Sequence, residues 1–118
     1  MDEHNFESLR VWQASRALVN AVYDIMENNK DWGFRDQIQR AAVSIMNNIA
    51  EGFESGSDAK FVNFLNIAKG SCSEVRSMLY LCKDRNFCTS DQFEDLKQQA
   101  ISINNQLYKF IQYLNNKS

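Results

Sequence analysis

Apolar residues recur with helical spacing along most of the chain. Over 58–83 and 90–115 they alternate in steps of three and four, which is the pattern of an amphipathic helix with one buried stripe. The same period, with a wider apolar arc, occupies 9–28 and 34–54. Sustained alternation of this kind favours nearly antiparallel packing against neighbouring helices. The pattern therefore predicts an all-α protein, an antiparallel up-down-up-down four-helix bundle formed by a single domain, residues 1–118.

Short polar stretches separate the four predicted helices. Ser8 and Ser57 stand where N-caps are needed, and Thr89 with Gln92 has the spacing of a capping box. Gly33 offers the turn into the second helix. Proline is absent, so nothing in the sequence breaks the long helices.

The helix predicted over 34–54 carries more apolar surface than one buried face needs. Its apolar residues span an arc of roughly 200°, whereas an outer helix of a monomeric bundle needs little more than about 100°. The helix over 9–28 has a similar excess in two adjacent stripes. We interpret the excess as a contact between subunits, with a broad, well-covered core as the alternative. The candidate interface residues are Val43, Met46, Ala50, Phe53, Val11 and Leu18.

A polar stripe lies beside this apolar surface on the second helix. If the second and third helices pair antiparallel, Arg40 lies near the level of Ser71. Glu74 stands among apolar residues of the third helix, where a buried carboxylate needs a cation or several donors. We therefore predict a desolvated Arg40–Glu74 ion pair, with a further hydrogen bond from Ser44 or Ser71. A solvated polar face is the alternative.

Composition narrows the class of protein. The net charge of -2 and the pI near 5.3 argue against a strongly basic nucleic-acid binder, but leave a local basic patch open. The three cysteines form no CxxC pair, which fits a reducing compartment. No apolar run approaches the roughly 20 residues of a membrane span, and no signal peptide follows Met1. We expect a cytoplasmic protein.

Few residues offer chemistry. His4 is the only histidine and Glu74 the only carboxylate predicted to face inward, so the sequence indicates no catalytic group and no metal site. The stretch KGSCSE at 69–74 lacks phosphate-loop spacing; within it, Gly70 predicts a close helix approach and Cys72 a core position. Cations do not alternate with aromatic residues as they do in single-strand binders. We expect no enzymatic activity, no cofactor and no small-molecule substrate.

Three blocks of the sequence resemble the 23S rRNA intervening-sequence proteins, a family of four-helix bundles also labelled S23 ribosomal protein. The blocks are FESLRVWQASRALV at 6–19, DQIQRAAVSIMNNIAEGFE at 36–54 and FVNFLNIAKGSCSEV at 61–75. Three of the matching family positions are Ala41, Gly52 and Gly70. The other six matching positions form the polar cluster that we take as the candidate site: Arg40, Ser44, Asn48, Glu51, Ser71 and Glu74.

The resemblance implies a bacterial protein that assembles as a cyclic homopentamer, of a gene type found inside intervening sequences of 23S rRNA genes. A related branch, the accessory protein of diversity-generating retroelements, is a basic pentamer that binds nucleic acid and a reverse transcriptase. This chain differs, with Glu54 and Ser55 where members often carry arginine. Two hypotheses stay open: a non-enzymatic oligomer that binds RNA or an RNA-handling protein, and a protein scaffold without nucleic-acid contact.

Overall fold

The computed structural model describes residues 5–117, which fold into four long helices. A short 3-10 turn, η1 (Phe6–Ser8), precedes them. The helices are α1 (Arg10–Met26), α2 (Trp32–Phe53), α3 (Asp58–Asp84) and α4 (Ser90–Asn116). Their bounds lie within two residues of the predicted ones. The prediction of an all-α fold with four helices is confirmed, whereas the pentameric assembly stays a prediction.

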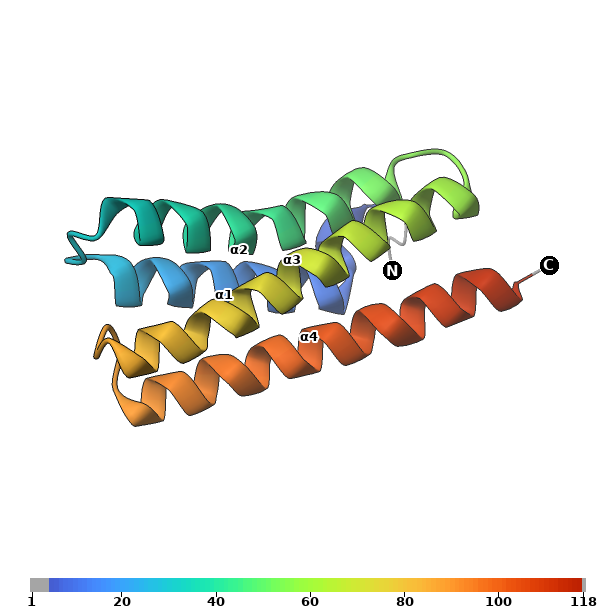
Figure 1. The fold of residues 1–118 in the computed structure, drawn as a ribbon. Helices are drawn as coiled ribbons and strands as arrows, with labels where there is room; N and C mark the ends of the chain where they lie inside the picture. Colours follow the sequence, from blue (N-terminus) through green and yellow to red (C-terminus); the bar gives the residue numbers. More distant parts are fainter. Residues whose placement is uncertain (1–4, 118) are drawn as a thin grey trace.

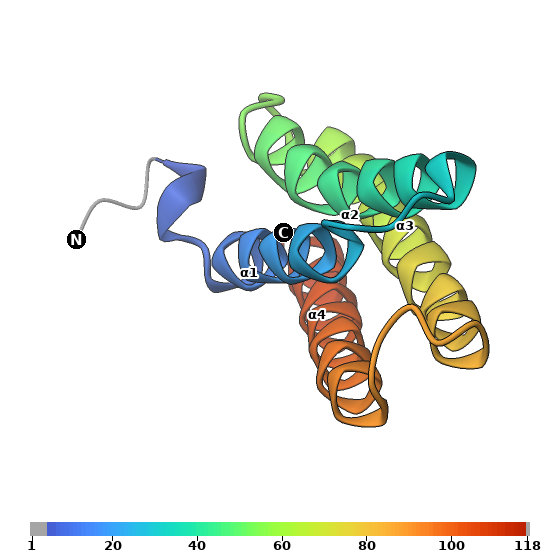
Figure 2. The same cartoon turned by 90° about the vertical axis from the view of Figure 1, so that its left-hand side faces the viewer.

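Consecutive helices run in opposite directions along a molecule that measures 48 × 25 × 19 Å (Figure 1). Each helix therefore packs against the next one in sequence, and α1 also packs against α4. The view turned by 90° shows α3 between α2 and α4, with α1 on the opposite side (Figure 2). Helix α3 thus has two grooves beside it, one shared with α2 and one shared with α4.

Local side-chain chemistry sets the start of each later helix. Ser57 accepts a hydrogen bond from the backbone N–H of Lys60 at 3.2 Å, so it is the N-cap of α3 as predicted. Thr89 and Gln92 form the predicted capping box of α4. These signals were readable in the sequence because a cap depends on residues only three positions apart.

Two predicted helix starts are wrong. Ser8 ends η1, where its backbone N–H donates to Asn5 Oδ1, and Leu9 takes the N-cap position of α1 without a side-chain hydrogen bond. Gly33 lies inside the first turn of α2 rather than in the turn before it. There Asp31 caps the helix, because its Oδ1 accepts from the backbone N–H of Phe34 at 3.2 Å. A carboxylate thus caps α2, whereas α1 begins without a side-chain cap.

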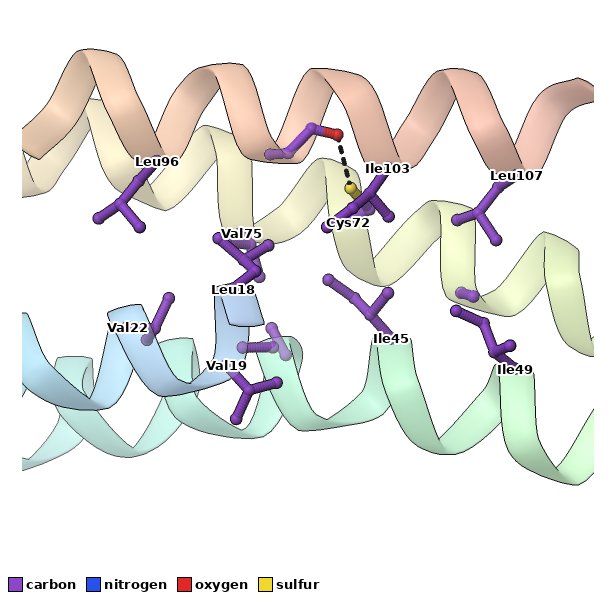
Figure 3. Packing of buried hydrophobic residues seen from close by; sticks show 14 of the residues in the cluster. Leu18, Val19, Val22, Ile45, Ile49, Cys72, Val75, Leu96, Ile103 and Leu107 are labelled. Atoms are coloured by element: carbon purple, nitrogen blue, oxygen red, sulfur yellow. Dashed lines mark hydrogen bonds between the residues drawn. The ribbon is translucent and has the colours of Figure 1, made fainter. Parts of the chain in front are cut away.

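The core runs the length of the bundle and contains apolar side chains from all four helices. Figure 3 shows Leu18 from α1, Ile45 from α2, Val75 from α3 and Ile103 from α4 pointing toward one another. The predicted stripes of α3 and α4 lie in this core, except that Phe110 is only partly buried.

Val11 and Leu18 are core residues, so their prediction as contacts between subunits is wrong. Their exposed fractions are 4% and 0%. The second stripe of α1 has an internal explanation, because α1 packs against both α2 and α4 and therefore buries a wide arc. The alternative of a broad, well-covered core is correct for this helix.

Two glycines differ in what surrounds them. A Cβ atom added at Gly52 on α2 would lie 2.7 Å from Cβ of Phe64 and 2.8 Å from Cδ1 of Phe61, both on α3. Gly52 thus allows α2 and α3 to come close together. No atom lies within 4 Å of a Cβ added at Gly70, so the predicted close approach at Gly70 is wrong within this chain. Gly70 faces outward on α3.

Candidate functional site

The groove between α2 and α3 brings part of the polar cluster together. Ser44 and Ser71 share a hydrogen bond of 2.8 Å between their hydroxyl oxygens. Asn48 donates from Nδ2 to the carbonyl oxygen of Ser44 at 2.8 Å and to its Oγ at 3.0 Å. All three side chains are partly buried. They form a small polar network whose members satisfy one another.

The predicted ion pair between Arg40 and Glu74 is not formed in this chain. Arg40 Nε instead donates to Asp36 Oδ2 at 2.9 Å, and these two side chains are 79% and 62% exposed. Glu74 is exposed and accepts a hydrogen bond from Gln37 Nε2 at 3.1 Å. The prediction was wrong because Glu74 faces solvent, beside an exposed Ile67, rather than lying within a buried apolar arc.

A shallow hollow follows the outer surface of α2. Arg40, Asn47 and Glu51 line it, and Tyr23 of α1 borders it. Glu51 is exposed, and its side chain has no hydrogen bond or ion pair with another residue of the described range 5–117. The polar cluster is therefore split, with an inner part at Ser44, Asn48 and Ser71 and an outer part that faces solvent.

The candidate interface residues of α2 keep part of their surface exposed. Val43, Met46 and Phe53 pack against the core from its edge, and Ala50 is partly buried as well. Phe53 makes an edge-to-face contact with Phe61, with ring centroids 6.0 Å apart. The single chain neither buries these four side chains fully nor leaves them fully open, so their role between subunits stays a prediction.

The groove between α3 and α4 contains a group of cations that sequence reasoning missed. Lys69, Arg76 and Lys83 recur every seven residues on α3, which places them in one row along the helix. Helix α4 adds Lys97 to this row. We call these four residues and the surface between them the basic groove. The seven-residue spacing was the available signal, but it required knowing which side of α3 faces α4.

Aromatic rings lie among these cations. Lys69 Nζ is 5.2 Å from the ring centroid of Tyr108, and Lys97 Nζ is 5.2 Å from that of Phe93. Lys83 Nζ is 4.9 Å from the same Phe93 ring. Cations and aromatic residues therefore alternate in space across two helices, although they do not alternate along the sequence.

The middle of the basic groove is a hollow without carboxylates. Its lining residues are Ser73, Arg76, Ser77, Tyr80, Lys97, Gln98 and Ile101. Arg76 is exposed, and its side chain makes no ion pair or hydrogen bond with another residue of the described part of the chain. Lys97 pairs with Glu94 on its own helix at 3.1 Å. A net positive potential is therefore expected here, in a protein whose overall charge is negative.

Cys72 and Cys82 are buried structural thiols rather than reactive ones. Cys72 Sγ donates a hydrogen bond of 3.2 Å to the backbone carbonyl of Ala100 on α4, which Figure 3 shows within the core. Burial raises the pKa of the Cys72 thiol to about 11 and that of Cys82 to about 12. The core position predicted for Cys72 is confirmed.

Residues 5–117 contain neither a metal-binding cluster nor a helix that could span a membrane. Within 5–117, no three or more histidine, cysteine, aspartate or glutamate side chains are grouped so that they could hold a metal ion. None of the helices in that range combines the length and the apolar character needed to cross a membrane.

Comparison with known proteins agrees with this architecture. A crystal structure of a protein of unknown function from the S23 ribosomal protein family of Bacteroides thetaiotaomicron VPI-5482 superposes with a TM-score of 0.80. The two sequences are 28% identical, and the match covers 86% of this chain and 97% of that one. No curated protein matches the chain.

A family model identifies the protein family of the chain. The model of the 23S rRNA-intervening sequence protein matches residues 7–109, which include α1, α2, α3 and most of α4. The resemblance of the three sequence blocks to this family is thereby confirmed. The chain belongs to the 23S rRNA-intervening sequence protein family.

Proposed function

We propose that this protein is a non-enzymatic RNA-binding protein and that the basic groove is its contact surface. The observation that carries the proposal is the middle of that groove, where Arg76 and Lys97 lie in a hollow without a carboxylate. Affinity for nucleic acid comes mainly from cations that neutralise phosphates. The unpaired Arg76 side chain is therefore available to bind a phosphate, although the protein as a whole is acidic.

The spacing of the cations suits an extended polyanion. Lys69, Arg76 and Lys83 are seven residues apart, so their Cα atoms are separated by about 10.5 Å along α3. The row therefore covers about 21 Å of groove, far more than a single phosphate or small metabolite spans. A chain of phosphates is the ligand that such a row matches.

The family description supports RNA as the polyanion. The family takes its name from the intervening sequences of 23S rRNA, and the similar crystal structure is of a protein of unknown function. A protein scaffold without nucleic-acid contact is the second candidate. It draws support from the acidic net charge of -2.

A gel shift with structured RNA at increasing salt tests the proposal. Binding must weaken as salt rises, because phosphate contacts release counterions. Arg76→Glu should reduce affinity roughly tenfold or more and lower the salt dependence by about one phosphate contact. Arg40→Glu is the matched control. It makes the same charge reversal at an exposed position on α2, away from the basic groove.

The outcomes separate the two candidates. Loss with Arg76→Glu and not with Arg40→Glu supports the basic groove. Equal loss with both variants contradicts it, since net charge alone would then govern binding. Absence of binding at low salt favours the protein scaffold.

We also propose that the protein acts in the cytoplasm as a homo-oligomer, and as a pentamer in line with the resemblance. Its three cysteines are free thiols, which suits a reducing compartment. The outer face of α3 carries half-exposed Ile67 and Leu81, which are two heptads apart, and exposed Gly70 lies between them. Partly exposed Val43 and Ala50 provide a second apolar surface on α2. Faces of this kind usually mark contacts between chains.

Light scattering at micromolar concentration tests self-association. Ile67→Arg should dissociate the oligomer while leaving helicity unchanged, because Ile67 is exposed in the single chain. Ser102→Arg on α4 adds the same charge at another exposed position and should leave the assembly intact. A stable wild-type monomer would contradict this proposal.

A further inference from the structure

We infer that the basic groove binds a single strand of RNA, whose unpaired bases stack on Tyr80 and Tyr108. The inference rests on the proposed function and adds the class of RNA to it. The residues that carry it are the two tyrosines, because cations alone bind any nucleic acid. An exposed aromatic ring beside them distinguishes an unpaired base from a paired one.

Tyr80 is a half-exposed ring held in a fixed position. It borders the carboxylate-free hollow together with Arg76 and Lys97, and its exposed fraction is 50%. Its ring packs edge-to-face on Phe93, with centroids 5.0 Å apart, and Phe93 is buried. The buried ring restrains Tyr80 from one side while the other side faces solvent.

Tyr108 provides the second ring, on α4. It is also 50% exposed, and its hydroxyl oxygen accepts a hydrogen bond from Gln112 Nε2 at 2.9 Å. Lys69 Nζ lies 5.2 Å from the centre of the ring. A phosphate beside Lys69 would thus place its own base near the Tyr108 ring.

The two rings are well separated along the groove. Tyr108 lies next to Lys69, and Tyr80 lies eleven residues further along α3, or about 16 Å along the helix axis. Arg76 and Lys97 lie between the two rings, and Lys83 lies just beyond Tyr80. The order along the groove is ring, cations, ring, which suits a short run of nucleotides whose bases stack while its phosphates face the cations.

A duplex would leave the rings unused. Its bases stack on one another inside the helix, and the major groove of A-form RNA is too deep and narrow for side chains to reach the base edges. Unpaired nucleotides expose their faces to tyrosine and arginine. The groove therefore favours single-stranded RNA, such as a loop or an end, over paired RNA.

Fluorescence anisotropy with a labelled RNA of about a dozen nucleotides tests the inference, with the same strand annealed to its complement as comparison. The single strand should bind roughly tenfold more tightly than the duplex. Tyr108→Ala and Tyr80→Ala should each weaken single-strand binding roughly five- to hundredfold, which is the loss of one stacked base. Neither should alter the salt dependence, because neither removes a phosphate contact.

Two further variants separate stacking from structure. Tyr80→Phe keeps the ring and should retain binding, so a loss seen only in Tyr80→Ala reports the missing ring. Tyr113→Ala is the matched control, because Tyr113 is 61% exposed and has Lys117 Nζ 5.6 Å from its ring. It lies five residues beyond Tyr108, rotated by about 140° away from the groove, so its loss should change nothing.

Each outcome decides one point. Equal affinity for single strand and duplex overturns this inference and leaves the proposed function standing. Tyrosine variants that bind like the wild type overturn the stacking contacts. Absence of binding to either RNA, at low salt and in folded wild-type protein, overturns the proposed function as well.

Discussion

The two grooves beside α3 differ in their polar side chains and in whether those side chains have partners within the chain. Between α2 and α3, serine, asparagine and glutamine side chains hydrogen-bond to partners in the same groove, as in the Ser44–Ser71 pair at 2.8 Å. Between α3 and α4, Arg76 has no such partner and Lys97 has one carboxylate on its own helix. The polar side chains between α2 and α3 thus bind one another, whereas the groove between α3 and α4 exposes an unpaired positive charge.

This difference suggests which groove holds the helices together and which can bind a ligand. Partly buried polar groups that satisfy one another stabilise packing, because each would cost free energy if left alone. An exposed and unpaired cation adds little to stability, and it can contact a phosphate without first breaking an internal bond. The matching family positions gather at the first groove, whereas the cations gather at the second.

The largest expected effect concerns the close contact between α2 and α3. Gly52→Ala places a methyl group 2.7 Å from Cβ of Phe64, so one helix must shift, and we expect a loss of about 1–3 kcal/mol in the free energy of unfolding. Gly70→Ala is the matched control in open space and should gain about 0.5–1 kcal/mol through helix propensity. Urea unfolding at an unchanged m-value measures both. A neutral Gly52→Ala would show that the two helices are less closely packed.

The next effect probes the buried layer between α3 and α4. Burial raises the pKa of Cys72 to about 11 and that of Cys82 to about 12, from the ordinary value of 9.0 for an exposed thiol. Above pH 9.0 the unfolded chain loses these protons while the folded chain keeps them, so stability falls as pH rises toward the folded values. The slope should approach about 1.4 kcal/mol per pH unit for each cysteine.

Urea unfolding at a series of pH values from about 8 to about 11 tests this prediction. Cys72→Ala has lower stability at every pH because it leaves a cavity, but it should show a shallower fall with pH. An identical slope in the wild type and in Cys72→Ala would contradict the prediction. All other residues are identical in the two proteins, so the difference between the two slopes reports Cys72 alone.

A smaller effect is expected for the polar network of the first groove. Ser44→Ala and Ser71→Ala should each cost about 1 kcal/mol, because each leaves a partly buried hydroxyl without its partner. The double variant should cost less than the sum of the single variants, since both partners are then absent. Thermal unfolding of the four proteins completes the cycle. Strict additivity would show that water replaces the missing hydroxyl.

Sequence reasoning succeeded where one helix determines the result. The steps of three and four in α3 and α4 predicted most of their buried residues, and the Thr89–Gln92 spacing predicted a cap. These features depend on residues within a few turns of each other. The apolar stripes of α1 were harder, because only the packing of α1 between α2 and α4 shows that Leu18 is core.

Contacts between helices were harder to predict. The number of residues from a turn gives the position of a residue along its helix but not the direction of its side chain. Counting residues from the turn placed Arg40 near the level of Ser71 and within reach of Glu74, but the level along the helix leaves open which way a side chain points. Gln37 lies about 60° nearer to α3 than Arg40 around the axis of α2, and Gln37 makes the hydrogen bond. The basic groove was missed for the same reason, since Lys97 joins Arg76 only when α3 and α4 pair.

The smallest expected effect concerns Arg40 and Glu74, at the solvent-facing edge of the first groove. Arg40 is exposed and pairs with Asp36 one turn away, and Glu74 is exposed and bonds to Gln37. An exposed ion pair contributes at most about 1 kcal/mol, whereas a broken buried pair costs about 3–5 kcal/mol. We therefore expect Arg40→Met and Glu74→Gln to cost less than about 1 kcal/mol each. The double variant should cost their sum, because the two side chains share no contact.

Urea unfolding of all four proteins at one fixed protein concentration measures the cycle. Large single losses with a much smaller loss in the double variant would reveal a buried pair that the single chain lacks. Since these residues are apart within one subunit, such coupling would have to arise between neighbouring subunits, and it should then disappear in the dissociated Ile67→Arg background.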